Sequence, residues 1–395
     1  MIIRQTLPHE AGQVNTLFSV AFDTPLSDCS ADPKNPKIRH WAAFEDDNET
    51  MMSTLSVSDY QIQFDGHSCK MGGIGGVATP PAYRRRGGIR GCFQVALPQM
   101  FADGYDFSYL YPFSTAYYRK FGYETCVQKF RWTVDLALLN PPAAAGFFRM
   151  ADKNAPMAEE IAAVDAVWEN RYNMTVRHTP EDYDWARKTD PAKTLEFTYV
   201  CFDGENRPIA YTTFKTANEP DGRNLGCSRL CFADSRGFFL LMQLFKTMCA
   251  DYRFVKFFTP ADPALQYLMP EWSLSAAKWE LTASCGMVRA VNVLSILKKA
   301  RYIGDGHLIL AISDKQIPEN NGTFSLEFAG GKAISAEKSE QSPDISMDVA
   351  AFSALIAGVL DFDSARQVFS HMEVRRESSA RQVFYRKPLM IADYF

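Results

Sequence analysis

Three arginines and two glycines stand together at residues 84–88, between a stretch with strand character and a stretch with helical spacing. Prolines follow Thr79 and close the strand, because proline cannot donate a hydrogen bond to a sheet. A helix start offers unpaired backbone N–H groups and a positive dipole end, so this loop predicts a pyrophosphate site. The helix is predicted by apolar residues at Ile89, Phe93, Ala96, Leu97, Met100 and Phe101.

The spacing within this loop partly matches a known signature. Arg84 followed by Gly87 resembles the Arg/Gln-x-x-Gly-x-Gly/Ala signature of the GNAT superfamily of acetyl-CoA-dependent N-acetyltransferases, although Ile89 stands where a second small residue is expected. No Lys-Ser or Lys-Thr pair follows the glycines, which disfavours a Walker-type nucleotide site. Taken alone, the stretch leaves open an ordinary basic loop between a strand and a helix.

An aromatic segment downstream supplies a second chemical candidate. Residues 105–113 alternate like a strand, after which Ser114 and Gly122 are the expected N-cap and C-cap of a short helix. The run Tyr118-Arg-Lys-Phe-Gly-Tyr resembles the GNAT motif whose tyrosine lies beside the thioester sulfur. That resemblance implies a catalytic role for Tyr118, whereas Tyr117 is interpreted as a core aromatic residue.

Length and composition limit the class of protein. A chain of 395 residues predicts two to three domains, and a net charge of −4 disfavours nucleic acid as a partner. The sequence begins without the apolar stretch of a signal peptide and contains no apolar run long enough for a membrane span, so we expect a cytoplasmic protein. Nine cysteines without a CxxC pair predict free thiols and no metal site.

The order of expected elements suggests three parts. Residues 1–130 give a strand, a helix over residues 9–22, further strands and the arginine loop. Residues 131–285 repeat helix, hairpin, strand, turn and helix, but their turn at residues 234–237 has no arginine cluster and carries Asp234, which would repel a phosphate. Residues 287–293 are expected to lead into a helix, and the strands and helices that follow resemble the small α+β fold of sterol carrier proteins.

This order and size resemble the Eis (enhanced intracellular survival) family of acetyltransferases. The resemblance implies a mixed α+β and α/β fold: a GNAT domain at residues 1–130, a degenerate GNAT domain at 131–285 and a sterol-carrier-like domain at 286–395. It also implies a homo-oligomer, a hexamer in that family, and acetyl-CoA as co-substrate without a metal. The implied acetyl-CoA contacts are Val77, Ala78, Thr79, Arg85, Arg86, Gly87, Gly88, Ile89, Arg90, Phe113 and Ser114.

The resemblance assigns the remaining roles as well. Tyr118 would be the proton donor, the C-terminal carboxylate of Phe395 the proton acceptor, and Phe22 with Asp23 part of the acceptor pocket. The chemistry is sound, because a protonated amine must lose a proton before it attacks and a leaving thiolate needs a hydrogen bond. We therefore expect acetyl transfer to the primary amine of a cationic, aminoglycoside-like or lysine-bearing acceptor. The alternative is a non-catalytic lipid- or protein-binding module that uses the GNAT fold as a scaffold.

Overall fold

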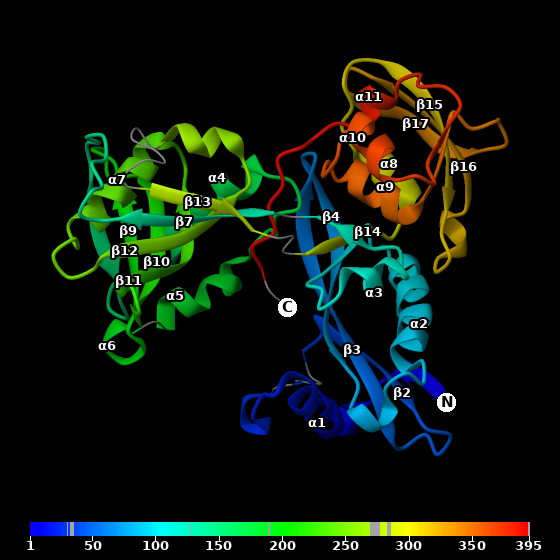
Figure 1. The fold of residues 1–395 in the computed structure, drawn as a ribbon, viewed down its shortest axis with the longest axis horizontal. Helices are drawn as coiled ribbons and strands as arrows, with labels where there is room; N and C mark the ends of the chain where they lie inside the picture. Colours follow the sequence, from blue (N-terminus) through cyan, green and yellow to red (C-terminus); the bar gives the residue numbers. More distant parts are fainter. Residues whose placement is uncertain are drawn as a thin grey trace. The chain divides into compact units, whose positions relative to one another are not determined.

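The computed structural model describes residues 1–29, 31, 35–126, 128–188, 190–268, 277–282 and 286–393. The chain forms two compact units, one of residues 1–126 with 286–395 (unit 1) and one of residues 127–285 (unit 2). Within the described residues there are three sheets, two in unit 1 and one in unit 2 (Figure 1). These sheets and their helices confirm the predicted mixed fold class.

The first sheet of unit 1 is covered by a helix on each face. Alternate residues of one strand point to opposite sides, so Trp41 and Ala43 pack in the core beneath α2 (Gly88–Ala102), while Ala42 and Phe44 pack with α1 (Ala11–Phe22). Figure 1 shows α1 and α2 on either side of β3. In order across the sheet the strands are β1 (Ile2–Gln5), β2 (Ile38–Phe44), β3 (Met51–Phe64), β4 (His67–Ala78), β5 (Phe107–Leu110), β14 (Met287–Ala290) and β6 (Glu124–Thr125).

Strand β14 comes just before the helix into which residues 287–293 were expected to lead. It pairs antiparallel with both β5 and β6, with Met287 opposite Leu110 on one side and Thr125 on the other. All four residues of β14 are buried, and the helix α8 (Val293–Lys299) begins after them. A segment distant in sequence therefore completes the sheet that carries the arginine loop.

A buried ion pair fixes β14 in place. Arg289 and Asp314 are fully buried, and the guanidinium donates to both carboxylate oxygens at 2.7 and 2.9 Å. The Arg289 Nε atom also donates to the Phe121 carbonyl at 2.7 Å, and Asn320 donates to Asp314 at 2.9 Å. Both charges thus have partners, as groups withdrawn from water require.

The second sheet of unit 1 is built by the C-terminal part of the chain. Helix α9 (Val349–Ile356) is buried along its whole length, and its Ser353 hydroxyl accepts a hydrogen bond from the Ala290 N–H at 2.8 Å. Helices α10 (Phe362–Val368) and α11 (Ala380–Val383) follow. In order across this sheet the strands are β17 (Lys332–Ser339), β16 (Gly322–Ala329), β15 (Gly306–Ser313), β18 (Ile345–Asp348) and β19 (Glu373–Val374).

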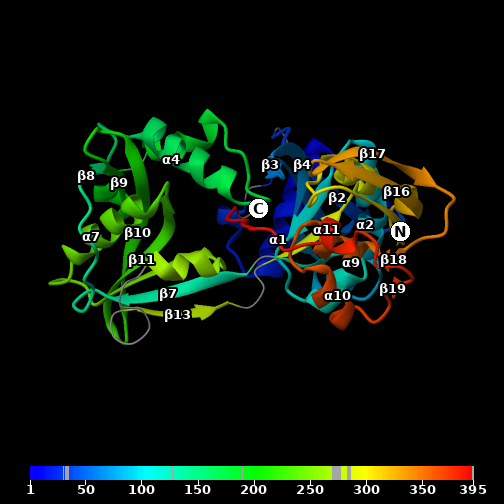
Figure 2. The ribbon, with the colours of Figure 1, turned by 90° about the horizontal axis from the view of Figure 1, so that it is seen from above.

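The sheet of unit 2 repeats the strand order of the first sheet by position. In both, the second strand of the long hairpin pairs in parallel with the strand that follows it. Counted from β1 and from β8, the sixth position is filled by a strand from a separate part of the chain. Helices α4 (Ala158–Arg171) and α7 (Ser235–Lys246) lie on opposite faces (Figure 2). In order the strands are β13 (Ala277–Leu281), β7 (Lys129–Asp135), β12 (Phe254–Pro260), β11 (Gly222–Phe232), β10 (Pro208–Glu219), β9 (Glu196–Phe202) and β8 (Phe147–Ala151).

The start of α7 differs chemically from the start of α2. Asp234 caps α7 by accepting from the Gly237 N–H at 3.1 Å, and its carboxylate also pairs with Arg236 at 2.6 Å. A carboxylate thus occupies the position at which a phosphate would approach the helix. Short helices α5 (Asp184–Lys188) and α6 (Pro191–Thr194) complete the helices of unit 2.

Candidate active site

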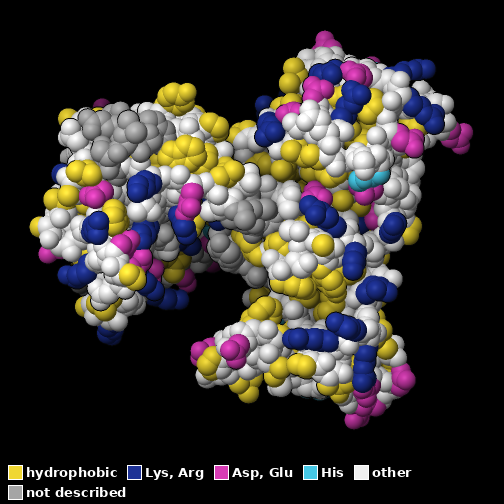
Figure 3. Space-filling model, in the orientation of Figure 1, with side chains coloured by type: hydrophobic (Ala, Val, Ile, Leu, Met, Phe, Trp, Pro, Cys, Tyr) yellow, Lys and Arg dark blue, Asp and Glu magenta, His cyan; other side chains and the backbone are white. Residues whose placement is uncertain are grey.

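Unit 1 contains a pocket of about 850 Å³ at the ends of α1, β4, α2 and α3 (Thr115–Arg119). This volume lies within the range of small-molecule and cofactor sites. Lys and Arg side chains gather beside hydrophobic ones over this part of unit 1 (Figure 3). The lining residues are Ala21, Phe22, Ser53, Val77, Thr79, Tyr83, Arg84, Arg85, Arg86, Gly87, Gly88, Ile89, Arg90, Gln94, Phe113, Tyr117, Lys120, Phe121 and Gln316.

Two glycines allow α2 to begin at the pocket wall. Gly87 precedes the helix with φ of 90°, a left-handed conformation that glycine adopts without steric cost. At Gly88 a Cβ atom would lie 2.4 Å from the Ser53 hydroxyl of β3, so a larger residue would push the helix away from the sheet. The first N–H groups of α2 therefore stay close to the pocket.

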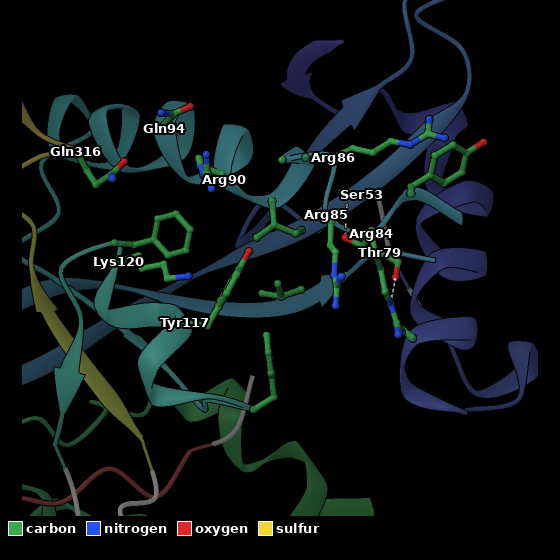
Figure 4. A pocket seen from close by; sticks show the side chains of 18 of the residues that line it. Ser53, Thr79, Arg84, Arg85, Arg86, Arg90, Gln94, Tyr117, Lys120 and Gln316 are labelled. Carbon is green, nitrogen blue, oxygen red and sulfur yellow. Dashed lines mark hydrogen bonds between the residues drawn. The ribbon is translucent and has the colours of Figure 1, made fainter. Parts of the chain in front are cut away.

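The four arginines of this region differ in their partners. Arg84 donates to the Thr79 carbonyl at 3.3 Å, and Arg86 pairs with Glu45 at 3.3 Å. No carboxylate in the described part of the chain pairs with Arg85 or Arg90, and both side chains are exposed. Arg85 also has a positive φ of 65°, which is uncommon for a residue with a side chain. Arg85 and Arg90 thus remain available for an anionic ligand (Figure 4).

Strand β4 stops pairing with β5 before it reaches the pocket. Its parallel pairing with β5 ends at Ile74 and Leu110, and its register against β3 shifts between Ala78 and Gly75, where β4 carries one extra residue. Such a bulge redirects a strand beside a functional site. The backbone of residues 76–79 is consequently free of β5 pairing, while Val77 and Thr79 line the pocket and the Ala78 side chain is buried away from it.

Helix α3 presents its two tyrosines differently. Ser114 caps it as predicted, accepting from the Tyr117 N–H, but the helix ends at Arg119, before the expected Gly122. Tyr117 lines the pocket, and its hydroxyl points across toward α2 (Figure 4). Tyr118 is 2% exposed and belongs to the core cluster, with its ring edge-on to Phe113 at 5.3 Å between centroids. Burial raises the pKa of both tyrosines, so both hydroxyls stay protonated at neutral pH.

Some of the other predicted site residues line the pocket and some do not. Phe22 and Phe113 line the pocket, whereas Asp23 and Ser114 are not among its lining residues. Sequence reasoning did not select Ser53, Gln94, Lys120 or Gln316. Gln94 could have been found, because it follows Arg90 by one helical turn.

The C-terminal segment is held against unit 1 as far as it is described. Ile391 is fully buried, and the Asp393 carbonyl accepts from the Tyr111 hydroxyl at 2.6 Å, directly after β5. Phe395, the predicted proton acceptor, lies outside the described residues.

In the described ranges, His, Cys, Asp and Glu side chains form no group of three that could hold a metal ion. None of the described helices has the length and apolar character needed to cross a membrane.

Comparison with known protein families identifies two parts of the chain. Residues 3–126 match the model of the acetyltransferase (GNAT) domain, and residues 293–384 match the model of the sterol carrier protein domain. These matches confirm both predicted domain types and the predicted acetyltransferase class. A comparison with curated protein sequences found no match.

Solved structures share the fold along the whole chain. A GCN5-related N-acetyltransferase from Anabaena variabilis is 19% identical with a TM-score of 0.84, and 100% of each chain is covered. A probable N-acyltransferase from Enterococcus faecalis V583 is 18% identical with a TM-score of 0.84, covering 100% of this chain and 99% of the other. Eis1 from Mycobacterium abscessus is 16% identical with a TM-score of 0.80, and both chains are covered completely. The chain thus contains a GNAT acetyltransferase domain at residues 3–126 and a sterol carrier protein domain at residues 293–384.

Proposed function

We propose that the protein transfers an acetyl group from acetyl-CoA to the primary amine of a cationic acceptor. The observation that carries this proposal is the arginine loop at the start of α2, where Arg85 and Arg90 face the pocket without an acidic partner among the described residues. Backbone N–H groups, helix dipole and guanidinium groups all favour a pyrophosphate at this position. The Asp234 cap at the start of α7 argues against a second donor site in unit 2.

The residues at the end of β4 fit the rest of the donor. Their backbone has no β5 partner, so the amides of residues 77–79 can bind an extended chain and polarise a carbonyl. Acetyl-CoA supplies an activated thioester, whose C–S bond breaks as the acceptor nitrogen bonds to the acetyl carbon. Tyr118 then provides a hydrogen bond or proton to the sulfur. Tyr117 is the second candidate for this role, because it lines the pocket.

The amine proton must go to a base. We assign it to the carboxylate of Phe395, as the resemblance implies. The buried Ile391 and the hydrogen bond between Asp393 and Tyr111 support this assignment, because they hold the tail beside the end of β5 as far as residue 393. The acceptor would enter past Phe22 at the end of α1, where the nearby Asp23 and Asp28 would favour a cation.

The Arg85→Ala variant is expected to weaken acetyl-CoA binding by about 1–3 kcal/mol, the range of a charged hydrogen bond. Isothermal titration calorimetry measures this change directly. Arg236→Ala is the matched control, because Arg236 lies in the first turn of α7, the corresponding helix of unit 2, and pairs with Asp234. Unchanged dissociation constants in both Arg85→Ala and Arg86→Ala would show that the loop does not bind the donor.

Adding residues after Phe395 is expected to lower turnover about a hundredfold, because it converts the proposed base into an amide. Deletion of Phe395 should act similarly, since it moves the carboxylate by about 3.3–3.6 Å. Steady-state kinetics on folded variants, with thermal melts as the folding check, measure the effect. Full activity with a C-terminal extension would transfer the role of base to Asp23 or to water.

The runner-up function, a lipid- or protein-binding scaffold, makes the opposite prediction for the donor. A scaffold need not bind acetyl-CoA, whereas the proposed enzyme must. Titration of the wild-type chain with acetyl-CoA up to millimolar concentration therefore separates the two functions. The acceptor class follows from a second assay that compares polycationic amines with neutral amines of equal size.

A further inference from the structure

A second buried ion pair of unit 1 joins the C-terminal segment to the turn between β3 and β4. Asp65 and Gly66 form this turn, and Lys387 lies a few residues after α11. The Asp65 and Lys387 side chains are 6% and 2% exposed, and the ammonium donates to the carboxylate at 2.5 Å. Figure 1 shows the red segment after α11 passing the end of the β3–β4 hairpin. Neither residue lines the pocket described above.

Other groups complete the surroundings of this ion pair. The same Asp65 oxygen accepts from the Arg301 backbone N–H at 2.7 Å, and the Lys387 ammonium lies 5.0 Å from the centre of the Phe64 ring. The Tyr385 hydroxyl donates to the Arg301 carbonyl at 3.1 Å. Burial lowers the pKa of Lys387, while the Asp65 carboxylate opposes this shift. A lysine withdrawn from water in this way requires a charged partner, so Lys387 fits this place only when it faces Asp65.

The backbone of the segment is held at the same residue. The Lys387 N–H donates to the carbonyl of Gly358, shortly after α9, at 3.0 Å. A Cβ atom on Gly358 would lie 2.5 Å from the Lys387 Cβ and 2.7 Å from its backbone nitrogen, so any side chain there would push the segment away. Lys387 is therefore fixed both through its backbone and through its side chain.

The tail, residues 387–393, has a second fixed point at its far end. The Asp393 carbonyl accepts from the Tyr111 hydroxyl at 2.6 Å. Strands β4 and β5 pair in parallel, the Asp65 turn precedes β4, and Tyr111 follows β5. The tail thus connects the beginning of this strand pair to its end, where Phe113 lines the pocket.

A buried ion pair contributes little net stability but discriminates strongly between registers. The attraction between the charges is largely offset by their lost hydration, so apolar side chains would stabilise the contact as well. A slip of the tail by one residue would move it by about 3.3–3.6 Å and leave two buried charges unpaired. Apolar side chains tolerate such a slip better, because hydrophobic contact is non-directional. The charges on Asp65 and Lys387 therefore select one register of the tail.

We propose that Lys387 is a positioning residue, whose ion pair with Asp65 fixes the register in which the tail reaches the end of β5. This inference rests on the proposed function, in which the carboxylate of Phe395 is the base for the acceptor amine. A base must lie within about 3.2 Å of its proton or one water away, so a slip by one residue puts it out of reach. Lys387 acts through the tail and not by contact with donor or acceptor.

Turnover and donor binding of three variants test this role. Lys387→Met is expected to lower kcat about tenfold or more, while the dissociation constant of acetyl-CoA in calorimetry stays unchanged. The double variant Lys387→Met with Asp65→Asn removes both charges but keeps an oxygen for the Arg301 N–H and a residue suited to the turn. It should recover thermal stability but not kcat. Arg386→Met is the matched control and should behave like the wild type, because the ion pair of Arg386 with Asp361 is exposed.

Release of C-terminal residues by carboxypeptidase Y, followed by mass spectrometry, measures the hold on the tail without catalysis. We expect release about fivefold faster in Lys387→Met and in the double variant, and at the wild-type rate in Arg386→Met. Equal release rates in all four proteins would overturn the proposal. Recovery of kcat together with stability in the double variant would also overturn it, because the pair would then act only on folding.

The two measurements separate this proposal from the proposed function. Faster release from Lys387→Met with unchanged turnover would confirm that Lys387 holds the tail and would overturn the assignment of Phe395 as the base. Failure of the wild type to bind acetyl-CoA would overturn the proposed function itself, while the release rates would still decide whether Lys387 fixes the tail.

Discussion

The Tyr118→Phe variant is expected to turn over roughly 10²–10⁴-fold more slowly than the wild type, the usual contribution of one acid–base group. Only the hydroxyl is removed, and the ring keeps its edge-on contacts with Phe93 and Phe113. The dissociation constant of acetyl-CoA should therefore change little. Burial raises the pKa of Tyr118, so its hydroxyl remains a hydrogen-bond donor across the neutral range and the loss should not depend on pH there.

Tyr117→Phe is the matched control for this prediction, because it removes the same group from the adjacent residue. Tyr117 lines the pocket, whereas Tyr118 lies in the core behind it. Turnover of both single variants and calorimetry with acetyl-CoA separate catalysis from binding. A large loss in Tyr117→Phe with normal turnover in Tyr118→Phe would assign the proton to Tyr117.

Arg289→Met is expected to reduce the free energy of unfolding by about 3–5 kcal/mol, because it leaves the Asp314 carboxylate buried without a counter-charge. It also removes the donor to the Phe121 carbonyl that joins β14 to the end of α3. Chemical denaturation followed by tryptophan fluorescence measures the loss. The control is Arg366→Met, whose ion pair with Glu377 is exposed and should contribute less than about 1 kcal/mol.

A double variant separates the buried charge from the lost packing. Arg289→Met with Asp314→Leu replaces both partners by apolar groups, and a buried pair replaced in this way commonly regains stability. We expect the double variant to be more stable than Arg289→Met alone. A double variant that is less stable than the single one would show that Asp314 acts mainly through its bonds to Gln316, Ile317 and Asn320.

Local rules were sufficient to predict the arginine loop and the helix after it. Apolar spacing, two prolines and two glycines each act within a few residues, and Ile89, Phe93, Ala96, Leu97 and Met100 are buried as that spacing predicts. The cap at Ser114 follows from the same kind of short-range rule. These features hold the start of α2 at the pocket, so this part of the site could be predicted from the sequence.

The choice between Tyr117 and Tyr118 could not be made by such rules. Adjacent residues on a helix point about 100° apart, so the side chain that faces the pocket depends on the phase at which the helix starts. Motif position favours Tyr118, while the structure lines the pocket with Tyr117. The roles of both tyrosines remain predictions that the paired variants test.

Long-range pairing explains why β14 and the position of Gln316 were not predicted from the sequence. Strand β14 has four apolar or buried residues, too few for periodicity to separate a strand from a helix start. Its partners β5 and β6 lie far back in the sequence. Gln316 has no local signal either, because its place in the pocket comes from the Asp314 contacts and not from the spacing of its neighbours.

The late position of β14 in the sequence also affects how the chain folds during its synthesis. On the ribosome β5 and β6 emerge early, but the strand that joins them, β14, follows only after residues 127–285. At the usual rate of translation that interval is roughly 10–30 s. During it the acetyltransferase sheet has an unpaired edge at β5, and unpaired strand edges favour aggregation. Nascent chains halted before residue 287 should therefore need chaperones and lack donor binding, and a gene fragment that encodes residues 1–126 alone should yield insoluble protein.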